Sequence, residues 1–195
     1  MNLTEMRARV REDLQDTDSQ NYRWTDDEVD GAIQRVVTEY SLQAPIEQQD
    51  DIATNEGDTG LDISSLSGLL EIKSVEFPIG QSPKYYQRTE YWAGHLYMED
   101  EGDGEDARVR WLKKHTLAAE STTIPAEHEE IIVLGATGYL AMSASAYTVD
   151  RASIAGRHAT INYQSWGMER LDRYDGKLKQ VARSSKVIPK ELYTK

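Results

Sequence analysis

The first group of residues whose spacing could support chemistry is His128-Glu129-Glu130-Ile131-Ile132. It begins like the helix of a zinc protease, in which two histidines four positions apart bind the metal and a glutamate between them acts as general base. Ile132 stands where the second histidine is needed. We therefore interpret these acids as side chains that complement the positive end of a helix dipole.

A second group is the acidic run at residues 99–106, which surrounds two glycines and could attract Ca²⁺. It lacks the alternating ligand spacing and the terminal glutamate of an EF-hand loop. We interpret it as a solvated hairpin tip that joins two strands.

Other catalytic patterns are weak. The four histidines are scattered, and the sequence has neither a nucleophile-elbow motif nor a phosphate-binding glycine loop. The sequence therefore predicts no enzyme, no metal and no cofactor. One alternative stays open, a small acidic metal-dependent hydrolase that uses residues such as Glu127, Glu129 or Asp103. The histidines are His95, His115, His128 and His158.

Aromatic residues gather between positions 85 and 111. They could stack on bases, as in proteins that bind single strands, but no basic groove accompanies them in the sequence. Packing within a sheet or contact between subunits is the favoured interpretation. The candidates for an inter-subunit contact are Tyr85, Tyr91, Trp92 and Trp111, with Tyr86 and Tyr97 nearby.

The composition limits the function further. The 195 residues carry 34 acidic and 22 basic side chains, a net charge of −12, and include no cysteine. This balance argues against a protein that wraps nucleic acid, because phosphate binding requires clustered Lys and Arg. The N-terminal residues do not resemble a signal peptide. The uncharged run Ile131–Val149 is diluted by Gly, Ser and Thr, so we expect a buried helix and no membrane span.

Two helices are predicted in the first part of the chain, at Leu3–Asp16 and Asp26–Leu42. Asn2 with Glu5, and Thr25 with Glu28, have the spacing of a capping box at each helix start. Trp24 and Val29 have the spacing of a hydrophobic staple around the second cap.

Between Glu47 and Ile124 the helical spacing fades, and short segments alternate with turn residues. We predict a small antiparallel sheet inserted between helices. The expected strands are Gln48–Thr54, Leu61–Ile63, Glu71–Phe77, Lys84–Trp92, His95–Glu99 and Ala107–Lys113.

Two further helices are predicted at Ala126–Thr148 and His158–Ser184. The third helix is rich in small residues, including Gly135 and Gly138, which would let another backbone approach closely. The fourth has apolar residues at packing positions and two i,i+4 ion pairs, Glu169–Arg173 and Asp175–Lys179. The apolar seam consists of Leu171, Tyr174, Leu178 and Val181.

The fold class expected from these patterns is α+β, mainly an α-helical bundle of four helices with an antiparallel β insertion between the second and third helices. The expected division is 1–46 with 125–186 as the bundle, 47–124 as the β subdomain and 187–195 as a C-terminal tail. Such a tail usually frays, but this one is apolar enough to dock on a partner. Its docking candidates are Val187, Ile188, Pro189, Leu192 and Tyr193.

The order of several short segments resembles the head–tail connector (adaptor) proteins of tailed viruses. The likeness is sharpest in the first two helices and weaker from Val75 onward; no single motif is diagnostic, so order and spacing carry it. The sharper segments are Leu3–Arg11, Asp16–Asp18, Tyr22–Asp26, Ile33–Arg35 and Glu39–Ser41. The weaker ones are Val75–Pro78, Gly135–Tyr139 and Trp166–Leu171.

This resemblance implies a structural virion protein made in the host cytoplasm and located in the neck between capsid and tail. Such proteins form a ring, commonly a 12-mer, that docks under the portal protein and extends the DNA channel. The ring then offers a platform for the next neck or tail ring protein. The resemblance also implies that the C-terminal segment docks on the portal, and that DNA passes without specific binding. An acidic channel would suit that passage, because like charge opposes phosphate binding. No membrane contact is implied.

Overall fold

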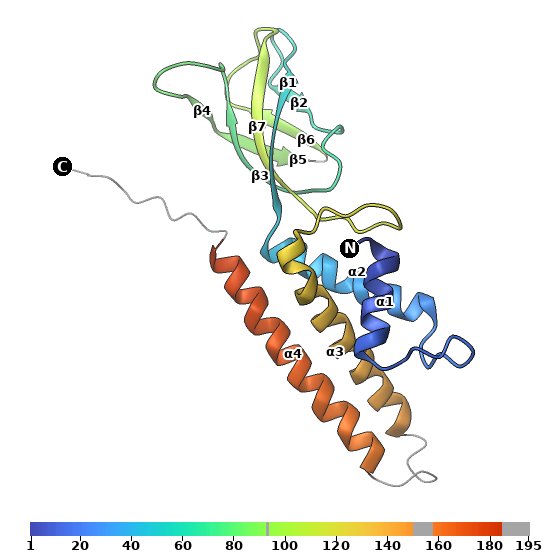
Figure 1. The fold of residues 1–195 in the computed structure, drawn as a ribbon. Coiled ribbons are helices and arrows are strands. Elements are labelled where there is room, and N and C mark those ends of the chain that lie inside the picture. Colours follow the sequence, from blue (N-terminus) through green and yellow to red (C-terminus); the bar gives the residue numbers. More distant parts are fainter. Residues whose placement is uncertain (93, 150–157, 185–195) are drawn as a thin grey trace, which may run out of the picture. The chain divides into compact units, whose positions relative to one another are not determined.

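The computed structural model describes residues 1–92, 94–149 and 158–184. The chain divides into two compact units. The helical unit consists of Met1–Ala44 and the chain from His115 onward, and the β unit consists of Pro45–Lys114. Figure 1 shows the helices at the two ends of the sequence and the strands in its middle.

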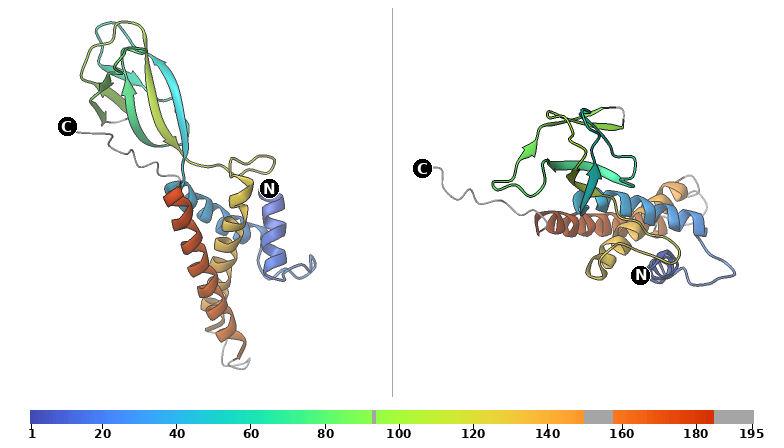
Figure 2. Two further views of the ribbon diagram at one scale, coloured as in Figure 1. Left: turned by 60° about the vertical axis from the view of Figure 1, so that its left-hand side comes forward. Right: turned by 90° about the horizontal axis from the view of Figure 1, so that it is seen from above.

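In its described residues, the helical unit contains four α-helices and one turn of 3₁₀-helix. The α-helices are α1 (Leu3–Asp13), α2 (Asp26–Gln43), α3 (Glu129–Val149) and α4 (His158–Ser184), and the 3₁₀ turn η1 (Ala126–His128) leads into α3. The helices α3 and α4 lie side by side along their lengths, as Figure 2 shows. Both α1 and α2 pack against α3.

The prediction of a mainly α-helical four-helix bundle with one β insertion is wrong. The protein is a mixed α+β structure with four helices and two antiparallel sheets. With only 11 residues, α1 cannot accompany the 27 residues of α4 along their length. The strands also divide between two sheets, so the β part is not one inserted sheet.

Both predicted capping boxes are confirmed. The Asn2 side chain accepts a hydrogen bond from Glu5 N (3.0 Å), and Glu5 Oε2 accepts one from Asn2 N (2.9 Å). Thr25 and Glu28 exchange the same pair of bonds at the start of α2. The first helix ends at Asp13, before the predicted Asp16, because Gln15 turns into the left-handed region (φ 54°).

The core of the helical unit confirms the apolar patterns. Gly135 and Gly138 of α3 allow close packing: a Cβ on Gly135 would lie 2.9 Å from Val36, and one on Gly138 would lie 2.9 Å from Leu171. The predicted seam of α4 packs in this core, as does most of the uncharged run in α3. No helix among the described residues is long and apolar enough to cross a membrane.

The β unit contains two antiparallel sheets. The first has the order β1 (Ile46–Ala53), β7 (Asp106–Lys113), β3 (Leu69–Glu76) and β4 (Tyr86–Gln87). The second has the order β2 (Gly60–Asp62), β6 (His95–Met98) and β5 (Thr89–Trp92). The expected single strand Lys84–Trp92 is therefore two strands, which belong to different sheets. A separate apolar core lies in this unit, including Leu61, Val75, Leu96, Val109 and Trp111.

The acidic run at residues 99–106 differs from the predicted hairpin tip. It carries the chain from β6 of one sheet to β7 of the other. Gly102 is buried in this crossing, donates to Asp58 O (2.8 Å) and accepts from Gly57 N (2.9 Å). A Cβ on Gly102 would lie 2.5 Å from Asn55 O, so this position requires glycine.

Candidate functional site

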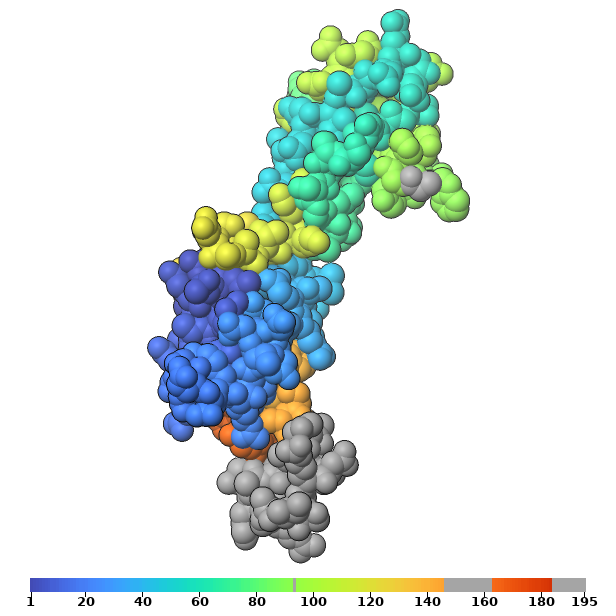
Figure 3. Space-filling view, turned by 90° about the vertical axis from the view of Figure 1, so that its right-hand side faces the viewer, coloured from blue at the N-terminus to red at the C-terminus, as the bar shows by residue number. Residues whose placement is uncertain are grey.

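A buried ion pair organises the segment between α1 and α2. The Arg11 guanidinium donates to Asp16 Oδ2 (2.6 Å), and each side chain is only 6% exposed. The same guanidinium donates to Trp24 O (2.9 Å) and Asp26 Oδ1 (2.7 Å), while Asp16 Oδ1 accepts from Arg23 N (2.8 Å). Figure 3 shows the face that α1, the following loop and the start of α2 form over this network.

The charges of this network lower the pKa of one of its carboxyl groups, that of Asp26. The hydrogen bond from Arg11 holds the pKa of the Asp26 carboxyl below its ordinary value; partial burial opposes this shift, and the charge of Arg7 adds to it. The helix cap and the ion pairs of this segment thus form one connected cluster. This cluster shapes the local fold and brings together no catalytic pair.

Exposed aromatic side chains mark the surface of the β unit. Every residue of β5 is exposed, and Trp92 reaches 70% exposure. Of the other predicted inter-subunit residues, Tyr85 and Tyr91 are also exposed. Trp111 is 4% exposed, and its indole N–H donates to Asp50 Oδ2 (2.6 Å). Trp111 therefore lies in the core of its own unit and is not part of the exposed aromatic surface.

A groove of about 390 Å³ lies beside β5, between the two sheets. Apolar side chains of β3 and β6 form much of its wall, and Tyr91 stands at its edge. Because β5 is an edge strand of its sheet, this region combines a groove with an unpaired strand edge. Its lining includes Leu69, Leu70, Glu71, Ile72, Thr89 and Tyr91.

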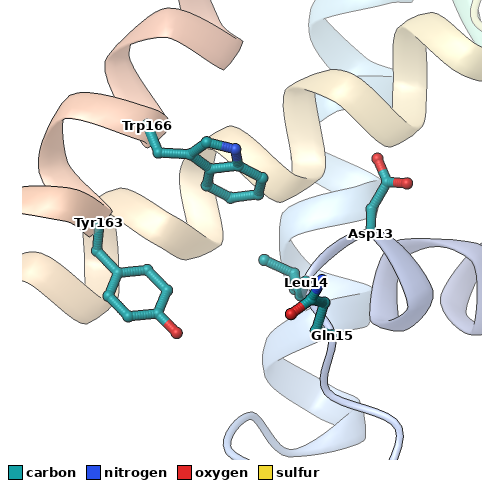
Figure 4. A pocket seen from close by; sticks show the side chains of 5 residues that line it. All are labelled: Asp13, Leu14, Gln15, Tyr163 and Trp166. Atoms are coloured by element: carbon teal, nitrogen blue, oxygen red, sulfur yellow. The ribbon is translucent and has the colours of Figure 1, made fainter. Parts of the chain in front are cut away.

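A pocket of about 330 Å³ lies in the helical unit between the end of α1 and α4. Figure 4 shows Asp13, Leu14 and Gln15 on one side and Tyr163 and Trp166 of α4 on the other. Its acid is already paired, since Asp13 Oδ2 accepts from Arg170 Nη1 (2.7 Å). The tyrosine ring is covered by the Arg23 guanidinium, 4.3 Å from its centroid. The pocket is therefore lined by aromatic rings, and the charged groups beside it already form contacts within the protein.

A second groove of the helical unit, about 470 Å³, lies where α2, α3 and α4 meet. Its polar wall is the Glu39 carboxylate, which accepts hydrogen bonds from the hydroxyls of Tyr139 (2.9 Å) and Tyr174 (3.2 Å) and from Arg35 Nε (3.1 Å). Burial raises the pKa of both tyrosines, and Glu39 raises it further. Leu42 is 63% exposed at this groove. We call this surface the Glu39 groove.

Sequence reasoning missed the Glu39 groove. The Arg35–Glu39 pair has i,i+4 spacing, which is a signal that the sequence offers. The two tyrosines are 100 and 135 residues away from Glu39, so their convergence depends on tertiary packing and leaves no local pattern.

The residues of the hydrolase alternative do not converge with one another in a metal-binding group. Glu129 pairs with the amino group of Met1, and His128 Nδ1 lies 2.6 Å from the Tyr40 hydroxyl. Asp103 belongs to the β unit, where its carboxylate accepts from Glu105 N (3.0 Å). Within the described ranges, no three His, Asp or Glu side chains are grouped so that they could hold a metal ion.

The other predicted histidine positions have structural or unremarkable surroundings. His115 is buried, with Nε2 2.9 Å from Ala44 O and Nδ1 2.9 Å from Thr123 O. His95 is exposed on β6. The predicted portal-docking residues lie outside the described residues: Val187, Ile188, Pro189, Leu192 and Tyr193.

No protein-family model matches this sequence, and no curated protein matches it.

Proposed function

We propose that this protein is a structural subunit of a virion neck, a head–tail connector that forms a ring beneath the portal. In this role it extends the DNA channel, provides the platform for the next neck or tail ring protein and has no enzymatic activity. DNA passes along the ring without specific binding.

The observation that carries the proposal is the order of residues through the first two helices, which resembles connector proteins. In this fold those residues are mutually dependent: Arg11, Asp16 and Asp26 are linked by direct ion pairs, and Trp24 supplies a backbone acceptor to the same guanidinium.

The surfaces are consistent with a protein that works by contact. The open grooves of both units are bordered by exposed apolar side chains, Tyr91 in the β unit and Leu42 in the helical unit. Exposed apolar side chains that gather at a groove are typical of protein–protein interfaces. The excess of acid over base also suits a channel past which DNA moves without adhering.

Portal binding by the C-terminal residues provides the test. Full-length protein and a variant that ends at residue 186 are mixed with purified portal rings of the same virus, and bound protein is measured by co-sedimentation. We expect the full chain to bind and the truncated chain to lose binding while its circular dichroism spectrum and thermal transition stay unchanged. A variant with Met168→Ser, which keeps the tail and alters an exposed side chain away from the grooves described above, serves as the control and should bind portal normally.

The outcomes separate two parts of the proposal. If the truncated chain binds portal as well as the full chain, the docking role of Val187–Lys195 is removed. If the full chain itself shows no portal binding, the connector function is contradicted.

A further inference from the structure

The helix α4 carries charges of opposite sign on two flanks. With roughly 100° between successive residues of a helix, Asp172 and Asp175 lie on one flank, and Arg173 and Lys177 lie roughly 150° away on the other. All four side chains are exposed. Each flank also carries one charge of the opposite sign, Lys179 beside Asp175 and Glu169 beside Arg173. The acidic flank borders the Glu39 groove, because Asp172 and Asp175 line it together with Leu42.

Two of these charges are uncommitted. Asp175 pairs with Lys179, and Arg173 pairs with Glu169, each within α4. Among the described residues, neither Asp172 nor Lys177 has an ion-pair partner. The helical unit thus presents a free carboxylate beside a groove on one flank of α4 and a free ammonium on the opposite flank.

We propose that the Glu39 groove binds a second copy of this chain through the basic flank of its α4. This inference rests on the proposed ring and identifies the faces that close it. Lys177 of one copy pairs with Asp172 of the next. The exposed Leu42 packs on the aliphatic stems of the neighbour's Arg173 and Lys177, since such stems cover apolar surface while their charged ends stay in water.

The proposed contact is head-to-tail, because the two surfaces that meet in it lie on opposite flanks of the same helix. Each copy offers an acidic groove to one neighbour and a basic flank to the other, so the same contact can repeat around a closed ring. An isologous dimer would instead place like charges of the two copies together, which opposes association. Complementary charge therefore favours a second copy, added in one direction, as the occupant of the groove.

A charge exchange tests the contact. Asp172→Lys and Lys177→Glu each place like charges across the proposed interface, whereas the double variant restores an opposite pair with its polarity reversed. The control is Lys73→Glu, which makes the charge change of Lys177→Glu at an exposed site of the β unit. Assembly is measured by sedimentation velocity for the chain alone and after mixing with portal-bearing capsids that lack it. Circular dichroism confirms that α4 stays helical.

We expect each single reversal to weaken assembly about tenfold or more, and the double variant to recover most of that loss. Higher salt should weaken wild-type assembly, because the pairs are at the surface. Single reversals that assemble like wild type, or a double variant no better than the single ones, overturn this contact and leave the ring proposal intact. A wild-type chain that assembles in neither setting contradicts both the contact and the ring.

Discussion

At the residue scale, Arg11 and Asp16 form a buried charge pair. A buried pair is stable only when each charge has its full set of partners, and here both are supplied: Arg11 reaches Trp24 O, and Asp16 accepts from Arg23 N. The loop between α1 and α2 is held by this pair, and no regular secondary structure supports it.

Replacing Asp16 with alanine should destabilise the helical unit by about 3 kcal/mol, because Arg11 loses its buried carboxylate partner and keeps only the exposed Asp26, while Arg23 N loses its acceptor. Urea denaturation followed by circular dichroism measures the loss. Asp18→Ala is the control, since Asp18 is exposed and accepts only within its own turn; its cost should stay below about 1 kcal/mol. Equal effects of the two variants would show that the buried pair does not hold the loop.

Acid should destabilise the fold in part through Asp26. Its pKa is lowered by the hydrogen bond from Arg11, so the folded state favours the charged carboxylate. That stabilisation is present above the unfolded pKa of about 4 and is lost as pH falls through the lower folded value. In Asp26→Asn the free energy of unfolding should therefore change less between pH 5 and pH 3 than in the wild type.

The comparison uses urea unfolding at several pH values, with Asp27→Asn as the neighbouring control. A slope in Asp26→Asn as steep as in the wild type would refute the assignment. A smaller acid response should remain in the variant, because Asp51 and Asp62 of the β unit also have lowered pKa values.

Residue contacts that follow from a fixed helical spacing were predictable, whereas contacts that depend on a turn or on tertiary packing were not. The capping boxes join residues three positions apart and follow from residue type alone. The Arg11–Asp16 pair spans only five residues, but it depends on the turn at Gln15 that ends α1. No residue pattern predicted this turn.

At the element scale, the pairing of α3 with α4 depends on glycine. The sequence correctly indicated that small residues in the third helix permit a close approach, and Gly138 is such a position beside Leu171. Gly176 on α4 has nothing within 4 Å of its would-be Cβ. Two helical glycines of similar appearance in the sequence therefore have opposite packing roles.

Alanine at these two glycines should give opposite results. Gly138→Ala inserts a methyl group against Leu171 and should destabilise by about 1–3 kcal/mol, less the helix-propensity gain. Gly176→Ala meets no neighbour and should stabilise by up to about 1 kcal/mol, because alanine is the better helix former. Thermal unfolding measures both. If Gly138→Ala proved as stable as Gly176→Ala, the tight contact of α3 with α4 would be in error.

Strand partners were the part of the fold least accessible from sequence. The six expected segments overlap the observed strands, yet Lys84–Trp92 divides at Arg88 between two sheets. Local alternation shows that a segment is extended, but the choice of partner strand is set by contacts distant in sequence. The burial of Trp111 in the core of its own unit could not be predicted for the same reason, because it depends on contacts distant in sequence.

At the scale of the whole molecule, the charge is unevenly distributed. Between Pro45 and Lys114 acidic residues outnumber basic ones by 15 to 7, so most of the net charge of −12 belongs to the β unit. A large net charge keeps subunits soluble and opposes their compact association until specific contacts compensate. The opposed flanks of α4 are the contacts that we propose for this compensation, and they belong to the less acidic helical unit.

The central claim is that this chain is part of the neck, and its position in the particle tests that claim most directly. Purified virions are labelled with antibody raised against the protein and imaged by immunogold electron microscopy. We predict label confined to the junction between capsid and tail. Label on the tail tip or the capsid shell, or no label on particles when infected-cell extract contains the protein, would contradict the connector function.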